Sequence, residues 1–120
     1  MEQFIFPPNN LIFSKDMDRE KLIITHDPFV LNFLSYQTHL NGVNMELTKK
    51  EFSLLALFIN NIGKINTSDF IYETVWGKPT KADYPELRKH ICYLRKKLDK
   101  GNSGYTITAV LGKGYCFQKR

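Results

Sequence analysis

The chain has 120 residues, 42% of them hydrophobic, which suits one globular domain with its own core and excludes two. Its formal net charge of +5 is uneven, because residues 1–50 carry five Lys or Arg against six Asp or Glu, whereas residues 51–120 carry twelve against six. The positive charge of the C-terminal part favours a polyanionic partner there.

The sequence also argues against a membrane protein and a metalloprotein. No run approaches the roughly 20 apolar residues that span a bilayer, and the chain does not open with a secretory signal pattern. We therefore expect a cytoplasmic protein with no membrane segment in this chain. Cys92 and Cys116 form neither a disulfide framework nor a metal-ligand cluster, so we expect two reduced thiols, no metal ion and no cofactor.

Residues 1–47 predict an antiparallel sheet. Short apolar or β-branched runs alternate there with prolines and polar turns. The clearest turn is Asn41-Gly42, which suits the positive φ angles of a two-residue hairpin and would join a strand at residues 35–40 to one at 43–47. The extreme N-terminus could equally be a loosely attached tail. The other expected strands are residues 4–6, 11–13, 21–25 and 29–34.

Three helices are predicted in residues 48–100. The first opens with the capping box Thr48-Lys-Lys-Glu51, followed by a largely apolar segment. Glycines are the expected stops of the first and second helices, and the short connections require close packing. The expected boundaries are a stop at Gly63, a start at Asn66 or Thr67, and a stop at Gly77.

The third helix, residues 84–99, preceded by Asp83, carries most of the functional signal. Asp83 and Glu86 indicate a capping-box-like start, with Pro85 tolerated in the first turn. A narrow apolar stripe at four-three-four spacing predicts that one face is buried. The stripe is Leu87, Ile91, Leu94 and Leu98; the opposite face holds Pro85, Glu86, Lys89, Cys92, Tyr93 and Lys96, with Arg88 and Arg95 on one flank and His90 and Lys97 on the other.

A β-hairpin is predicted after the third helix. Residues 105–110 are rich in β-branched and aromatic residues, Gly112-Lys113-Gly114 is a tight turn, and residues 115–118 return. Three helices followed by such a hairpin form a winged helix-turn-helix, in which one helix enters the major groove of DNA and the hairpin reaches neighbouring backbone or minor groove. We expect one α+β domain over residues 1–120, with a sheet and a possible tail at 1–47, the helical core at 48–100 and the wing at 104–118.

Five short motifs occur in order across residues 41–117. They are Leu47-Thr48-Lys-Lys-Glu51-Phe52, Gly63-Lys64-Ile65, Val75-Trp76-Gly77, His90-Ile91 with Leu94-Arg95-Lys96-Lys97-Leu98, and Gly112-Lys-Gly-Tyr115. In their order and spacing the chain resembles the OmpR/PhoB-type winged-helix domains of bacterial transcription regulators. The third helix also has some likeness to the membrane-anchored ToxR/CadC-like one-component branch.

The resemblance implies a fold, a function and partners. The implied fold is an N-terminal antiparallel sheet, a three-helix core and a C-terminal wing. Members of the family regulate transcription by binding double-stranded DNA in a sequence-specific way, commonly as two protomers on repeated half-sites. The linker at residues 77–84, with Lys78 and Lys81, would correspond to a loop that in this family can touch RNA polymerase.

The sequence departs from the family where DNA contacts are expected. Pro85, Glu86, Cys92 and Tyr93 stand where family members often carry Arg, Thr or Ser, and Leu111 stands in place of a wing Arg. Cys and Tyr lack the bidentate fork of Arg, so we do not expect Arg-type reading of guanine at those positions.

Other side chains therefore become the candidate contacts. Lys89 and Lys96 are candidates for base or phosphate contacts, and Tyr93 could stack or touch a thymine methyl. The flank residues suit phosphate contacts because they lie at the helix edges. Two alternatives stay open: His90 packed against the sheet, and Tyr93 packed on the wing. The predicted DNA-facing set is Arg88, Lys89, His90, Cys92 (as a small spacer), Tyr93, Arg95, Lys96, Lys97 and Lys113.

Two other functions compete with DNA binding. The sequence offers no paired-carboxylate, Ser/His/Asp or Cys/His arrangement with supporting motifs, so we expect no enzyme. The alternative is a winged helix that has lost its DNA contacts and binds protein. The chain is too short to add a phosphoacceptor receiver domain, so it is either a stand-alone regulator or the effector domain of a longer one. The N-terminal Met favours a natural start.

Overall fold

The computed structural model describes residues 22–81 and 83–120. The strands expected at residues 4–6 and 11–13 lie outside this range. In chain order the elements are β1 (Ile23–His26), β2 (Phe29–Asn32), β3 (Gln37–Leu40), β4 (Val43–Asn44), α1 (Lys49–Asn60), β5 (Ile65–Thr67), α2 (Ser68–Trp76), α3 (Pro85–Lys100), β6 (Tyr105–Val110) and β7 (Gly114–Lys119).

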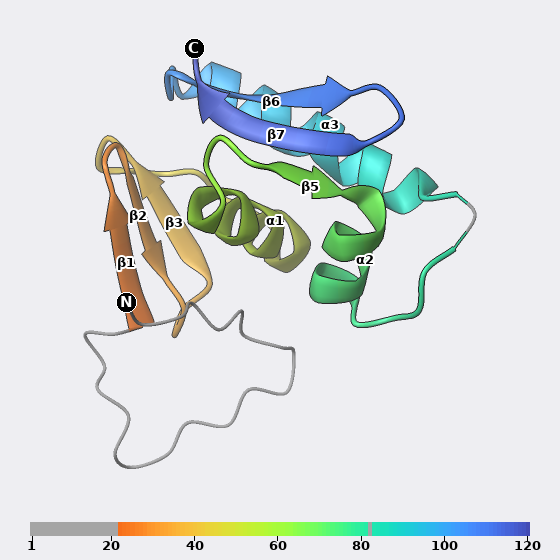
Figure 1. The fold of residues 1–120 in the computed structure, drawn as a ribbon. Helices are drawn as coiled ribbons and strands as arrows, with labels where there is room; N and C mark the ends of the chain where they lie inside the picture. The colour runs from red at the N-terminus through yellow and green to blue at the C-terminus, as the bar shows by residue number, and fades with distance from the viewer. Residues whose placement is uncertain (1–21, 82) are drawn as a thin grey trace.

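Two antiparallel sheets and three helices make up the α+β arrangement. Figure 1 shows α1 between the sheet of N-terminal strands and α2, with β6 and β7 lying over α1 and α3. The predicted N-terminal sheet, helical core and C-terminal hairpin are confirmed. They surround one core, because the buried apolar side chains of both sheets and all three helices form a single cluster.

The N-terminal sheet has the order β1-β2-β3-β4. The predicted hairpin is confirmed: Asn41 and Gly42 have φ angles of 51° and 80°, and Leu40 pairs with Val43 across the turn. Positive φ at both central residues matches the twist of paired strands. Phe29 and Leu31 of β2 are buried and turn this sheet toward α1.

Two strands of this sheet are shorter than predicted because Asn side chains end them. The Asn32 side-chain oxygen accepts the Leu34 N–H at 2.9 Å, and the Asn44 side-chain oxygen accepts the Glu46 N–H at 2.8 Å. These local bonds replace the next step of the ladder with a turn. β2 therefore stops before residue 34, and β4 stops before residue 47.

The capping box of α1 is confirmed. Thr48 Oγ1 accepts the Glu51 N–H at 3.2 Å, and Glu51 Oε1 accepts the Thr48 N–H at 2.9 Å. Residues 51–59 are all buried, so α1 is the central helix of the core. It ends at Asn60, before the predicted stop at Gly63, whose N–H instead donates to the Phe117 carbonyl of β7 at 2.8 Å.

The strand β5 was missed in the sequence. Its three residues pair antiparallel with β7, so the predicted hairpin belongs to a three-stranded sheet of order β5-β7-β6. The close approach depends on Gly114, where an added Cβ would lie 2.0 Å from the Asn66 carbonyl oxygen. The predicted cap of α2 follows at once: Thr67 Oγ1 accepts the Phe70 N–H at 3.0 Å, and Gly77 ends the helix with φ 66°.

The stripe of α3 is confirmed, but the capping box predicted at its start is wrong. Leu87, Ile91, Leu94 and Leu98 are each at most 1% exposed. The helix begins at Pro85 with Tyr84 as N-cap, and no side chain within the described residues caps it. The Asp83 carboxylate does not form the expected box with Glu86; it accepts the Tyr84 N–H at 2.9 Å and binds Arg88.

Candidate nucleic-acid interface

The outer face of α3 is the exposed surface predicted from the sequence. The stripe holds the helix against the core, and Lys89, Cys92, Tyr93 and Lys96 are exposed on the opposite side. The Lys89 ammonium lies 5.8 Å from the centre of the Tyr93 ring, which makes the two side chains one amphipathic contact surface. Tyr93 is 42% exposed.

Tyr93 and His90 belong to a row of rings between α2 and α3. The His90 ring meets Trp76 edge-on at 5.4 Å and Tyr93 at 6.5 Å between centres. Its Nδ1 lies 2.7 Å from the Glu86 carbonyl oxygen and must donate to it, so Nδ1 carries the proton. His90 thus packs against α2, and the alternative of packing against the sheet is wrong. The Tyr93 ring contacts two residues of α3 itself, the His90 ring and the Lys89 ammonium group.

The flank of α3 that faces the wing is already hydrogen-bonded. Arg88 Nη1 donates to Asp83 Oδ1 at 2.5 Å, and this ion pair lowers the pKa of Asp83 and raises that of Arg88. Arg95 Nε donates to the Ile107 carbonyl of β6 at 2.8 Å. Both guanidinium groups keep other N–H donors, so they could still reach a phosphate.

The opposite flank carries an ion pair whose carboxylate is buried. Lys97 Nζ lies 2.6 Å from Glu51 Oε1 and donates to the Glu46 carbonyl oxygen at 2.9 Å. The Glu51 side chain is 2% exposed, against 33% for Lys97. Of the basic residues predicted to contact DNA, Lys97 is therefore the one most fully bound within the protein.

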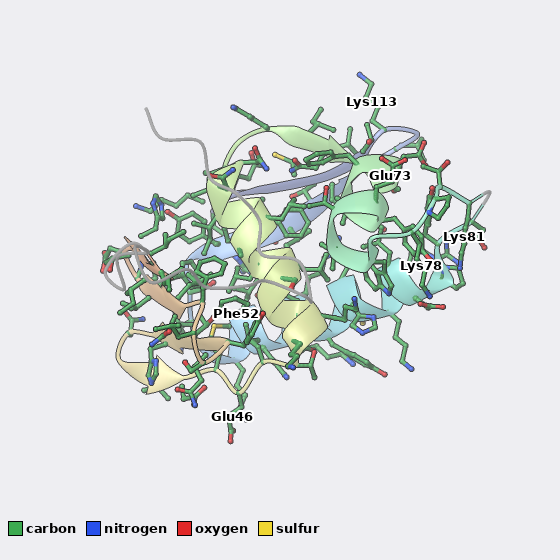
Figure 2. The ribbon with its side chains drawn as sticks, turned by 90° about the horizontal axis from the view of Figure 1, so that it is seen from below. Glu46, Phe52, Glu73, Lys78, Lys81 and Lys113 are labelled. Atoms are coloured by element: carbon green, nitrogen blue, oxygen red, sulfur yellow. The ribbon has the colours of Figure 1, made fainter. Side chains whose placement is uncertain are left out.

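The wing supplies a second projection. Figure 2 shows Lys113 pointing away from the body of the protein at the turn between β6 and β7, and the neighbouring Leu111 is 99% exposed. A groove of about 520 Å³ separates this turn from the start of α2, where Thr67 and Ser68 line it. Sequence reasoning missed this groove, because it depends on the pairing of β5 with β7.

The loop between α2 and α3 is fixed by Tyr84. The ring of this buried side chain packs on Tyr72 at 4.8 Å between centres. Its hydroxyl donates to the Asp69 carboxylate and accepts the Lys81 N–H at 2.9 Å; burial, together with the hydrogen bond to Asp69, raises the pKa of Tyr84. Figure 2 shows Lys78 and Lys81 together at this edge of the protein.

Residues 22–81 and 83–120 form no helix long and apolar enough to cross a membrane. Within the same ranges, no three His, Cys, Asp or Glu side chains are grouped so that they could hold a metal ion.

Comparison with protein families settles the relationship of the chain. A family model described as "Transcriptional regulatory protein, C terminal" matches residues 42–117. The chain belongs to this family. Its resemblance to OmpR/PhoB-type domains is thereby confirmed, whereas the likeness to the ToxR/CadC-like branch gains no support from the comparisons.

Relatives in this family agree with the fold. The response regulator SaeR of Staphylococcus epidermidis is 31% identical over 121 residues, which cover 98% of this chain and 53% of SaeR; the chain spans about half the length of that relative. The DNA-binding domain of CpxR from E. coli superposes with a TM-score of 0.68 at 27% identity, covering 81% of this chain and 96% of that domain. The DNA-binding domain of Klebsiella pneumoniae RstA, solved in complex with the RstA box, gives 0.69 at 26% identity, covering 80% and 96%.

Proposed function

We propose that this chain is the sequence-specific double-stranded DNA-binding domain of a transcriptional regulator. In this proposal α3 enters the major groove and the wing lies on adjacent backbone or minor groove. Members of the same family with this fold include the RstA domain, which was solved in complex with the RstA box. We assign the chain no catalytic activity, and binding to chromosomal DNA would place its action in the cytoplasm.

One observation carries the proposal: the face of α3 that points away from the core presents exposed lysines beside an exposed aromatic ring. Lys89 and Lys96 supply positive charge for the DNA backbone, and Tyr93 supplies an apolar surface for a thymine methyl. Cys92 lies between them as a small side chain that lets the helix approach the groove. Lys113 on the wing extends the same charge to neighbouring phosphates.

The flank residues have a supporting part in this arrangement. Arg88, Arg95 and His90 lie at the edges of α3; Arg88 makes two hydrogen bonds to Asp83, and Arg95 and His90 each make one within the protein. The remaining guanidinium donors of Arg88 and Arg95 suit phosphate contacts, which orient the helix without reading sequence. The neutral His90 ring with its proton on Nδ1 presents an acceptor at Nε2. We assign no phosphate contact to Lys97.

The test is binding of duplex DNA by variants of single lysines. Lys89→Ala should weaken binding to the preferred duplex by roughly tenfold, the worth of about one base contact. Lys64→Ala is the matched control, since Lys64 is also exposed but lies at the end of the wing sheet away from the turn, and it should leave the affinity unchanged. Equal effects of both substitutions would contradict the assignment of α3 as the reading helix.

A protein-binding winged helix is the second candidate. The observation that favours it is the internal engagement of Arg88, Arg95 and Lys97, together with the acidic Glu86 at the start of α3. This candidate predicts no binding to any duplex at low salt, where nonspecific electrostatic binding is strongest.

Two further partners belong to the proposal. The exposed Lys78 and Lys81 sit on a loop that Tyr84 holds in place, and we propose that this loop contacts RNA polymerase. Two protomers would bind repeated half-sites. The double variant Lys78→Ala with Lys81→Ala should then reduce transcription from a dependent promoter. Its affinity for DNA should change by less than about twofold, which is less than half of the binding free energy that corresponds to a tenfold change.

A further inference from the structure

The Lys97 side chain extends from α3 toward α1, and its ammonium group binds two acceptors within the protein. Its ammonium lies 2.6 Å from Glu51 Oε1 and 2.9 Å from the Glu46 carbonyl oxygen. These two acceptors come from the first turn of α1 and from the segment between β4 and α1. One side chain of α3 therefore binds both the central helix and the end of the N-terminal sheet.

Loss of Lys97 from the Glu51 carboxylate would be costly. The Glu51 side chain is 2% exposed, and its Oε1 also accepts the Thr48 N–H that closes the capping box. A buried carboxylate needs a compensating cation, and removing that cation leaves a charge without solvent. Moving Lys97 to a DNA phosphate would leave the buried Glu51 carboxylate without its cation.

The second acceptor is held in place as well. Glu46 has a φ of 55°, in the left-handed region that few non-glycine residues adopt, and its N–H is bound by the Asn44 side chain. This turn presents the Glu46 carbonyl to Lys97. Figure 2 shows the Glu46 side chain pointing out into solvent, so the backbone oxygen is the group that is used.

Arg95 provides a tether on the other side of the same turn of α3. Its Nε binds the Ile107 carbonyl of β6 at 2.8 Å. Residues two apart on a helix are about 200° apart around its axis, so Arg95 and Lys97 hold opposite flanks of α3. Two such tethers fix the rotation of the helix about its own axis, and this rotation decides which side chains face a groove.

We infer that Lys97 is a positioning residue for DNA recognition: bound to Glu51 and Glu46, it sets the rotation of α3 and does not contact phosphate. The inference rests on the proposed function. Because Tyr93 lies on the exposed face of the same helix, the direction of its ring toward a base edge depends on this setting.

The test compares two ways of breaking the pair with a neighbouring control. In Glu51→Gln with Lys97→Met no charge is left buried alone, and the Gln amide oxygen can still accept the Thr48 N–H. This double variant should bind the duplex selected by the wild type at least about tenfold more weakly, the loss of about one base contact. A scrambled duplex should be bound as by the wild type. The slope of log K against log salt should stay unchanged, because no phosphate contact is lost.

Lys96→Met is the control, and it should lower the affinity for both duplexes and reduce that slope by about one. Glu51→Gln alone is the second variant: it removes the ion pair and keeps the charge of Lys97, which is then held only by neutral acceptors such as the Glu46 carbonyl oxygen. If Lys97 positions α3, this variant loses specificity. If Lys97 contacts phosphate, the ammonium without its ion pair leaves binding unchanged or strengthens it, which overturns the inference.

Two other results would also overturn it: a salt slope in the double variant that falls as it does in Lys96→Met, or unchanged affinity for the selected duplex. A wild type that binds no duplex contradicts the proposed function instead, and the inference is then tested on the free protein. Residual dipolar couplings should show α3 reoriented against α1 in the double variant and unmoved in Lys96→Met. An unmoved α3 in both variants overturns the inference.

Discussion

Lys89 and Lys96 differ from Arg88, Arg95 and Lys97 in the surroundings of their charged groups. Both are exposed on the outer face, whereas Arg88, Arg95 and Lys97 each bind an acceptor within the protein. An ammonium is a compact, strongly hydrated charge without the planar fork of Arg. The outer face of α3 is therefore suited to phosphates and single base acceptors.

The ion pair between Asp83 and Arg88 leads to a prediction about the pKa of the Asp83 carboxylate. Hydrogen bonds from Arg88 and then from the Tyr84 N–H lower the pKa of Asp83. Because the folded pKa lies below the unfolded one, the stabilisation is present above the unfolded pKa and is lost as the pH falls through the folded pKa. In Arg88→Ala the pKa of Asp83 should rise toward its ordinary value.

The measurement is a pH titration of the Asp83 carboxyl carbon by NMR in the wild type and in Arg88→Ala. Lys89→Ala is the control, since it removes a neighbouring positive charge that makes no hydrogen bond to Asp83 in the described residues. A titration that is the same in Arg88→Ala and in the wild type would refute the ion pair.

At the scale of elements, the seating of α3 depends on its apolar stripe. Leu94 is fully buried in the middle of that stripe. Leu94→Ala should lower the free energy of unfolding by roughly 2–5 kcal/mol, the usual cost of such a truncation in a core. Urea denaturation measures the change, and Lys96→Ala, on the exposed side, should stay within about 0.5 kcal/mol. Equal stabilities of the two variants would show that the stripe is not in the core.

The wing sheet depends on the close approach of β5 and β7. At Gly114, with φ 151°, an added Cβ would lie 2.0 Å from the Asn66 carbonyl oxygen, whereas at Gly112, with φ 70°, it would meet nothing within 4 Å. Gly112→Ala should cost about 1–2 kcal/mol of left-handed strain, measured as the free energy of unfolding. Gly114→Ala should cost more and should release the β5 amides to hydrogen exchange. A smaller cost at Gly114 than at Gly112 would contradict the packing of β5 on β7.

Local signals in the sequence were enough for much of the fold. The Thr48–Glu51 capping box, the Asn41-Gly42 hairpin and the stripe of α3 all depend on residues a few positions apart, and each is confirmed. β5 was missed because three residues carry no periodicity, and its last residue, Thr67, is also the cap of α2. The capping box of α3 was misassigned because the Asp83 carboxylate binds Arg88 and the Tyr84 N–H instead of pairing with Glu86.

The roles of the site residues were less accessible to sequence reasoning. The pattern placed the basic residues on the correct faces of α3. It could not show that Lys97 binds Glu51, 46 positions earlier, or that Arg95 binds Ile107 on the wing. Two lysines side by side in the sequence, Lys96 and Lys97, thus have different surroundings because their partners come from distant elements.

At the scale of the whole molecule, charge and fold point to the same partner. The positive charge is concentrated in residues 51–120, which contain α3 and the wing, and this favours a polyanion at that side. The family of the chain and its superposition on the DNA-binding domains of CpxR and RstA agree with such a partner. Sequence-specific binding of double-stranded DNA is therefore the central claim.

The most direct test is selection of duplexes from a random pool by the wild-type protein, followed by a salt titration on the enriched sequences. The account predicts a defined motif, present as a repeat if two protomers bind, and an affinity that falls linearly with log salt. Tight binding without an enriched motif would indicate recognition of DNA shape. Absence of binding to every duplex at low salt would contradict the account and favour a protein-binding winged helix.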